Sequence, residues 1–507
     1  MTNEYLKPMT GLPRRVGVLA ALVCLAFMAA LPASGEWNDS IRWKAELDAT
    51  FSGGRNTPFW LVNNLQGLSS VERNNGYFRL SAFHDMDTTR RFTWGAGVDL
   101  AVAWRFSSTF IVQQLYGEVK YRCLSAMLGS KEMSGCFNNP RLSSGNLLFS
   151  NNSRPIPQLR LGIFDYADIW GLRGWLGIKG YIAFGAFTDS RWQRSWVPEG
   201  GKRTDGVLFH SKGLWLRNGN PDKFPLTIEC GIEMATQFGG TCYTLDGDVI
   251  RMPHSLKDWF KAVVPLKGGS DTPDGEKVNV QGNMVGCWNF CASWTPKADW
   301  SVKAYFEHYF EDHSQLYIDY RWRDGLWGVE ADLPDNPFVS GIVYEYIHMK
   351  DQSGPLLNDK NDKVPEQVSG NDNYYNHYLY AGWEHWGMGI GNPMVLSPLF
   401  NRNHDIRFRS NRMYGHHVGI TGDPVPGLSW RLLVSFSRNW GTYAAPLERE
   451  MDNFNALAEV TWKPAALKGW EGTISVAGDS GPLMGKSLGV GIKISKSGWF
   501  DFKKRKR

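Results

Sequence analysis

Beyond its first 31 residues, this 507-residue sequence has no apolar run long enough to cross a membrane as a helix, which takes about 20 consecutive apolar residues. It also lacks a strong charge of either sign, because 55 lysines and arginines are nearly balanced by 50 aspartates and glutamates. Loss of residues 1–35 would remove three basic residues and one acidic residue, which leaves 52 minus 49, or +3. Such an even balance gives no reason to expect nucleic acid as a partner.

Cysteine is scarce, with seven in the whole chain. Cys287 and Cys291 would lie about 13 Å apart on one face of a regular strand, which is too far for a disulfide. Cys230 falls on an apolar strand face and is expected to act as a small hydrophobic residue. Cys123 and Cys136 remain as a candidate local pair. No cysteine or histidine spacing matches a zinc site, so we predict no metal and no cofactor.

Local catalytic signatures are also missing. Residues 478–482 resemble the nucleophile segment of serine proteases, but they lack its second glycine and are typical of a hairpin turn. His416 and His417 are adjacent on a predicted strand, so their rings point to opposite faces and cannot share a metal ion. We therefore predict that the protein is not an enzyme.

What the sequence does contain is strand periodicity. Within residues 92–104 every even position is apolar, and the odd positions are small or polar. The same alternation returns at 41–51, 226–234, 284–294, 428–438 and 453–463. Several of these runs exceed ten residues, whereas an average strand has about 5–6 and a tilted strand across a bilayer needs about 9–11. The pattern predicts an all-β fold, a transmembrane antiparallel β-barrel with Val98 and Leu100 toward lipid and Asp99 toward the lumen.

The amino-terminal residues predict export. Lys7, Arg14 and Arg15 precede an apolar stretch at 16–31, and small residues follow at 33–35, which is typical of a signal peptide. We expect residues 1–35 to be removed and residues 36–507 to form the barrel in a Gram-negative outer membrane, with lipid as its partner. The 23 tryptophans favour either a bilayer interface or stacking on sugar rings, and composition does not separate the two.

The periodic runs outnumber the strands that we expect, which are about 16–18 at bilayer-crossing length. The candidates are 41–51, 77–85, 92–105, 110–121, 157–164, 175–187, 206–216, 225–238, 284–295, 300–311, 316–322, 326–333, 338–349, 375–386, 405–422, 428–439, 453–463, 470–477 and 487–500. The rest is concentrated in insertions at 52–76, 123–156, 188–205, 239–283 and 351–404. We expect 52–76, 123–156 and 239–283 to plug the lumen. Apolar spacing after Ser255 predicts a short helix, which could lie inside the barrel, on a rim or along the membrane surface.

The carboxyl end predicts the orientation. Bacterial barrels with an even number of strands have short periplasmic turns and longer external loops. If the last strand, 487–500, ends in the periplasm, residues 441–452 and 478–486 are external. Residues 423–427 and 464–469 are then periplasmic turns.

Six segments, in this order, resemble the Wzi family of capsule assembly proteins in the form found in Bacteroidetes. They are 153–157 (SRPIP), 309–314 (YFEDHS), 324–330 (DGLWGVE), 350–355 (KDQSGP), 372–377 (DNYYNH) and 389–393 (GIGNP). The resemblance implies an 18-stranded outer-membrane barrel with a helical element that blocks its periplasmic side. It further implies a lectin-like protein, without catalysis, that helps to anchor capsular polysaccharide, and it leaves contact with the capsule export machinery open. The basic tail after Phe502 departs from the aromatic ending that is common in such barrels.

A glycan anchor needs aromatic faces for sugar rings and planar polar groups for hydroxyls and carboxylates. The candidates are Trp440, Tyr443 and Arg449 near a predicted external loop, and Tyr374, Tyr375, Asn376 and His377 in the longest insertion. Interface packing is the alternative for the first set, and plug packing is the alternative for the second. We predict an outer-membrane barrel that binds surface polysaccharide. The main alternative is a passive diffusion channel, and a barrel hydrolase is a third.

Overall fold

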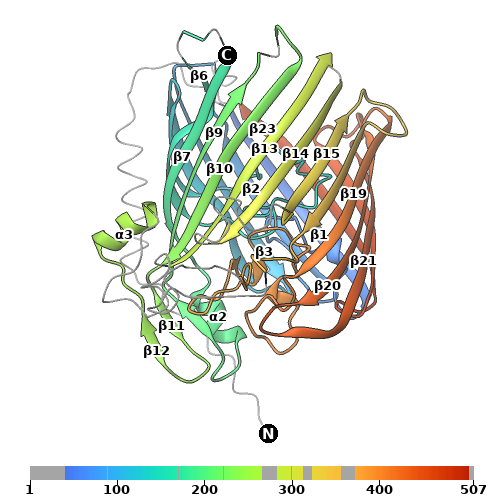
Figure 1. Cartoon of the computed structure of the whole chain (residues 1–507). Coiled ribbons are helices and arrows are strands. Elements are labelled where there is room, and N and C mark those ends of the chain that lie inside the picture. The colour runs from blue at the N-terminus through green and yellow to red at the C-terminus, as the bar shows by residue number, and fades with distance from the viewer. Residues whose placement is uncertain are drawn as a thin grey trace. The chain divides into compact units, whose positions relative to one another are not determined.

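Eighteen antiparallel strands form one sheet that closes on itself, because β1 (Ser40–Gly54) pairs with both β2 (Asn75–His84) and β23 (Ser487–Asp501) (Figure 1). The computed structural model describes residues 40–87, 89–169, 171–172, 174–220, 222–264, 282–297, 300–311, 323–354 and 371–501. The barrel forms the unit Ile41–Phe500. The predicted fold class is confirmed, and the predicted signal peptide at 1–35 lies outside the described residues.

Each strand pairs with the next one along the chain. The first half continues with β3 (Phe92–Trp104), β4 (Phe110–Tyr121), β5 (Leu124–Ser130), β6 (Gln158–Asp168), β7 (Leu176–Ala186), β9 (Leu208–Asn218) and β10 (Leu226–Phe238). The second half comprises β13 (Asn283–Lys297), β14 (Trp300–Glu311), β15 (Gly325–Asp332), β16 (Gly341–His348), β19 (Met413–Val425), β20 (Leu428–Gly441), β21 (Pro446–Trp462), β22 (Trp470–Ser480) and β23. Connections therefore alternate between the two ends of the barrel.

Short elements lie in these connections. The helices are η1 (Phe59–Leu61), α2 (Ser190–Trp196), α3 (Leu256–Val263) and η2 (Pro398–Phe400). The short strands are β8 (Arg203–Asp205), β11 (Thr241–Tyr243) and β12 (Val249–Arg251) in one sheet, and β17 (Glu384–His385) with β18 (Met388–Gly389) in another. None of the helices in the described residues has the length and apolar character needed to span a membrane.

The side chains of β3 alternate as predicted. Val98 and Val102 are exposed on the outer face, at 44% and 56% of their surface, whereas Asp99 is fully buried on the lumen side. Asp99 forms an ion pair with Arg79 of the neighbouring strand β2 and accepts a hydrogen bond from Gln114 of β4 at 3.0 Å. On β3 the lumen-facing charge is therefore paired, while the outer face of this strand is apolar.

The two ends of the barrel differ in their connections. At the turn end, residues 122–123 join β4 to β5 and residues 426–427 join β19 to β20. At the loop end, which is the lower end in Figure 1, residues 131–157 join β5 to β6 and residues 349–412 join β16 to β19. The long connections thus all enter from one end, where they can fold into the lumen.

Three strand predictions need correction. β5 was not expected, because its seven residues are shorter than a bilayer-crossing run and follow the polar 122–123 turn. Residues 375–386 are not a barrel strand, because successive residues from Leu379 to His385 are all buried and show no alternation between two faces. The strand predicted at 405–422 begins only at Met413. The candidate at 316–322 lies outside the described residues.

The connections alternate between the two ends of the barrel as predicted, but the predicted length of one loop is wrong. Residues 442–445 and 481–486 lie at the loop end, and residues 426–427 and 463–469 lie at the turn end. The predicted loop at 441–452 is much shorter, because β21 already begins at Pro446.

The predicted helix is confirmed as α3 and lies outside the barrel (Figure 1). At its start, the Asp258 carboxylate accepts hydrogen bonds from the Ser255 backbone nitrogen at 2.7 Å and the Ser255 hydroxyl at 2.6 Å. Its Trp259 ring packs on the outward ring of Phe184 at 5.0 Å. At its end, the Val263 carbonyl accepts a hydrogen bond from Lys212, an outward-facing residue of β9. A cation at a helix carboxyl end is stabilising, and α3 thereby covers polar groups on the outer wall.

All cysteines in the described residues are free thiols. Cys287 and Cys291 are buried on the lumen side and Cys230 is exposed on the outer face, as the strand phase predicts. The candidate pair of Cys123 and Cys136 is not formed. Cys123 is exposed in the turn before β5, whereas Cys136 belongs to an inserted segment.

Three inserted segments, 55–74, 131–157 and 371–412, fill much of the lumen, and we call them the plug. Its centre is apolar, since Tyr374, Tyr375 and Trp383 are fully buried. The expectation that insertions occlude the barrel is therefore met by 55–74 and 131–157. The prediction for 239–283 is wrong in its described part, because α3 lies on the outer wall, and 371–412 takes that place.

Buried carboxylates on the wall hold the plug. Glu345 of β16 accepts hydrogen bonds from the Ser143 hydroxyl at 2.6 Å and from the Ser144 backbone nitrogen at 2.7 Å. Glu307 of β14 accepts one from the Leu147 backbone nitrogen at 2.7 Å. The wall and the segment 143–147 therefore form one hydrogen-bonded unit.

Because Val98 lies on the outer face of the barrel, a charge at this position is expected to destabilise the protein in a membrane. Val98→Asp should lower the free energy of unfolding in lipid vesicles by about 1–3 kcal/mol, because lipid cannot solvate a carboxylate. Val98→Ala, which keeps the surface apolar, is the control. A spin label at position 98 that reports contact with water would contradict the assignment of this face to lipid.

Because Glu345 bonds to the plug, its removal is expected to weaken the attachment of the plug to the wall. Glu345→Ala should cost about 1–3 kcal/mol of stability for each buried donor left without a partner and should make residues 143–147 accessible to protease. Glu46→Ala, which removes a lumen carboxylate that bonds only to wall residues Lys44 and Tyr77, should leave the plug protected. Equal protection in the two variants would show that the plug does not depend on Glu345.

Candidate functional site

Among the described residues, two cavities of about ligand size lie between the plug and the barrel wall. The β6–β10 cavity has a volume of about 370 Å³ and is bounded by β6, β7, β9 and β10. The β1–β23 cavity has a volume of about 270 Å³ and is bounded by β1, β2 and β20 to β23. In the strand order these two arcs lie on opposite sides of the barrel. Small-molecule pockets measure about 300–1,000 Å³, so both cavities are of ligand size or close to it.

One row across three strands shapes the β6–β10 cavity. Tyr181 of β7 pairs with Gly213 of β9, which pairs with Glu233 of β10. Because Gly213 has no side chain, the Tyr181 hydroxyl reaches across β9 and donates a hydrogen bond to Glu233 Oε1 at 2.6 Å. A Cβ at position 213 would lie 2.3 Å from Trp215 Cη2 and 3.0 Å from Tyr181 Cε1. The glycine therefore allows this contact.

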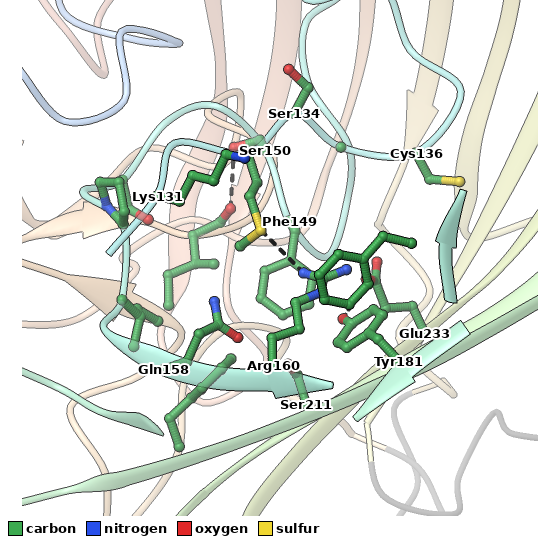
Figure 2. A pocket seen from close by; sticks show the side chains of 18 of the residues that line it. Lys131, Ser134, Cys136, Phe149, Ser150, Gln158, Arg160, Tyr181, Ser211 and Glu233 are labelled. Atoms are coloured by element: carbon green, nitrogen blue, oxygen red, sulfur yellow. Dashed lines mark hydrogen bonds between the residues drawn. The ribbon is translucent and has the colours of Figure 1, made fainter. Parts of the chain in front are cut away.

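Arg160 of β6 lies over the Tyr181 ring, with its Cζ 3.4 Å from the ring centre (Figure 2). Its Nη1 donates to Met133 Sδ of the plug at 3.1 Å. This is the one hydrogen bond that the guanidinium group makes within the described residues. Cation–π contacts hold Arg160 in place and leave most of its donors free for another acceptor.

Lys179 of β7 is surrounded by rings. Its Nζ lies 4.8 Å from the ring centre of Tyr166, 5.1 Å from that of Trp215 and 5.9 Å from that of Phe137. Such contacts stabilise an ammonium group modestly. They do not neutralise its charge.

The plug side of the same cavity adds Arg154 and Cys136. Burial lowers the pKa of Arg154 to about 10, and its Nη2 donates to the Ser107 hydroxyl at 2.9 Å. Burial raises the pKa of the Cys136 thiol well above its usual range. A thiol in that state is a poor nucleophile and a poor metal ligand.

The β1–β23 cavity is also lined by charges, but its charges are paired. Lys44 Nζ lies 2.5 Å from Glu46 Oε2, and Arg431 Nη2 lies 3.0 Å from Glu459 Oε1. Lys493 approaches Asp48 at 3.9 Å. Internal pairing leaves little affinity for an outside ion.

Asp324, His348 and Asp351 are the one group of potential metal ligands within the described residues. Asp324 Oδ1 accepts from the Asp351 backbone nitrogen at 3.1 Å and lies 2.8 Å from His348 Nδ1. Its Oδ2 accepts from the Gln352 backbone nitrogen at 2.5 Å. The protein itself satisfies the central carboxylate, and this favours a structural role.

The predicted residues of the longest insertion lie in the plug. The rings of Tyr374 and Tyr375 are fully buried, so no sugar can stack on them in this structure. The Asn376 amide bonds to both backbone polar groups of Phe408, at 2.9 and 3.0 Å, and thereby links two segments of the plug. Burial lowers the pKa of His377 to about 3, and its Nδ1 accepts from backbone nitrogens of the following turn. These contacts match the plug-packing alternative.

The other predicted residues lie at the loop end. Trp440 is on the outer face of β20, where Lys350 Nζ lies 4.0 Å from its ring centre. The Tyr443 hydroxyl donates to the Asp351 carbonyl at 2.7 Å, and Arg412 lies over its ring at 3.9 Å. Arg449 is exposed in β21. Tyr443 and Arg449 border the loop end, whereas the position of Trp440 matches the interface alternative.

A basic surface on the plug was not predicted. Arg402, Arg407 and Arg409 are exposed in the segment between η2 and β19, and Asp405 is the carboxylate within it. The His404 ring stacks on Trp196 of α2, with ring centres 4.1 Å apart. The clustering of arginines in residues 402–412 is visible in the sequence, but alternation in the same stretch was interpreted as a strand.

No known family profile matches the sequence, and no curated protein matches it. Among solved structures, the fold is similar to that of Wzi, an outer-membrane protein involved in group 1 capsule assembly in Escherichia coli and described as a carbohydrate-binding β-barrel. The match has a TM-score of 0.51 and 13% identity and covers 96% of this chain and 89% of that chain. OccK5 (OpdH) of Pseudomonas aeruginosa matches with a TM-score of 0.47 and 12% identity, over 92% and 100% of the two chains. OprD of the same organism matches with 0.45 and 11%, over 92% and 97%. The closed 18-stranded sheet and the likeness to the Wzi structure show that this chain has the fold of an outer-membrane β-barrel.

Proposed function

We propose that this protein lies in the Gram-negative outer membrane and binds capsular or other surface polysaccharide there without chemical turnover. The observation that carries this proposal is a basic and aromatic surface at the loop end, which we call the plug face. It consists of Arg402, His404, Arg407 and Arg409 of the plug, with Trp196 of α2 stacked on the His404 ring. Guanidinium groups bind carboxylates and hydroxyls in fixed geometry, and an exposed ring such as that of His404 can stack on a sugar. The likeness to a carbohydrate-binding barrel agrees with it.

The orientation of the barrel supports the same proposal. The short turns lie at the end where β23 finishes, and the long connections lie at the other end. Bacterial barrels have short turns in the periplasm and longer loops outside. With that orientation the plug face points to the cell surface, where capsule is retained. The helical element that the Wzi resemblance implies on the periplasmic side has no counterpart among the described plug residues, which enter from the loop end.

The passive-channel alternative is tested by conductance. The purified protein should show no steady porin-sized conductance in planar bilayers, because Glu307 and Glu345 hold the plug across the lumen. Stable open pores of the unmodified protein would instead favour the channel.

Capsule retention tests the proposed function itself. Deletion of the protein should leave polysaccharide synthesis intact and shift polymer from the cell surface to the medium, since an anchor changes retention and not production. Arg407→Gln combined with Arg409→Gln should reproduce part of this loss, with normal barrel assembly.

Arg91→Gln is the matched control, because Arg91 is an exposed arginine at the opposite end of the barrel. It should retain capsule like the unmodified protein. Normal capsule retention in the deletion strain would reject the anchoring role.

A further inference from the structure

The β6–β10 cavity carries an unbalanced positive charge. Its charged lining residues are four basic and one acidic: Lys131, Arg154, Arg160, Lys179 and Glu233. The β1–β23 cavity is lined by four basic and four acidic residues: Lys44, Arg79, Arg431, Lys493, Glu46, Asp48, Glu132 and Glu459. The two cavities lie in the same lumen, so the difference between them comes from particular residues and not from the barrel as a whole.

The two cavities also differ in the ion pairing of their basic residues. Every basic residue of the β1–β23 cavity has a carboxylate oxygen within 4 Å. In the β6–β10 cavity Lys131 has one, Glu118 at 2.6 Å. Arg154, Arg160 and Lys179 have no ion-pair partner in the part of the chain that the structure describes. A buried or half-buried cation without a counterion is costly, and a bound anion would remove that cost.

The cavity also has unused polar groups for a hydroxylated ligand. Gln158 Oε1 and Trp215 Nε1 are buried in its wall without a hydrogen-bond partner. Gln158 lies beside Arg160 on the same face of β6, two residues away (Figure 2). Unpaired buried polar atoms are uncommon in native proteins and point to a missing water or ligand. One is an acceptor and the other a donor, which suits a polyol better than a simple ion.

We propose that the β6–β10 cavity binds a carboxylate-bearing monosaccharide, such as a hexuronate unit. Arg160 and Lys179 hold the carboxylate, and Gln158 and Trp215 bind the ring hydroxyls after small side-chain rotations. Glu233 accepts the Tyr181 hydroxyl hydrogen bond and fixes the ring under Arg160. This site is inside the barrel and is distinct from the plug face, so the inference does not rest on polysaccharide binding at the cell surface.

Calorimetric titration of the purified full-length protein with D-glucuronate tests the inference. Binding should be measurable, D-glucose should bind at least about tenfold more weakly because it lacks the charge-assisted hydrogen bonds, and acetate should be weaker again because it lacks hydroxyls. Arg160→Gln and Lys179→Gln should each weaken glucuronate binding about tenfold or more.

Lys493→Gln is the matched control, because Lys493 is a lumen lysine of the β1–β23 cavity. It should bind glucuronate within about twofold of the unmodified protein, given its distance from the proposed site. The inference is overturned if glucuronate does not bind, if glucose or acetate binds equally well, or if Lys493→Gln weakens binding as much as Lys179→Gln. Circular dichroism and heat-modified electrophoretic mobility confirm that each variant is a folded barrel. Polysaccharide binding by the plug-face variant Arg407→Gln, Arg409→Gln is measured in parallel, so a failure of either site is seen separately.

Discussion

The structure depends on one constraint, which is that every backbone polar group in the hydrocarbon region must find a partner within the protein. A sheet meets this requirement only when it closes, and here β1 closes it by pairing with both β2 and β23. Side chains alternate with a period of two along every strand, so closure of the sheet divides them into a lipid face and a lumen face. The charged side chain of Lys212 also points to the outer face. It has a partner within the protein, because the Val263 carbonyl at the end of α3 accepts its hydrogen bond.

A lumen of eighteen strands is too wide for its own side chains to fill. The chain fills it with long connections from one end, and the polar backbone of those connections requires partners of its own. Glu307 and Glu345 provide them from the wall. The lumen-facing side chains, which would line a water-filled channel in an open barrel, therefore anchor a plug. Beside the plug, the described residues enclose two cavities of about ligand size that differ in charge.

The alternation in the sequence was sufficient to predict the barrel and the faces of Val98, Asp99 and Cys230, since a strand has only two faces. It was not sufficient for the plug, because Tyr374 and Tyr375 are buried by residues distant in sequence. The Tyr181–Glu233 contact across Gly213 was equally hidden, as it depends on the register of three strands. The arginines at 402–409 were visible as a charge cluster, but an apparent strand pattern concealed their surface role.

The central claim, a plugged barrel that binds surface polysaccharide, is tested most directly by equilibrium binding of purified capsular polysaccharide to the purified protein in lipid nanodiscs. We expect saturable binding that weakens as salt rises, because arginine contacts to an acidic polymer are screened. Absence of binding at low salt, with the barrel folded and the polymer intact, would contradict the account.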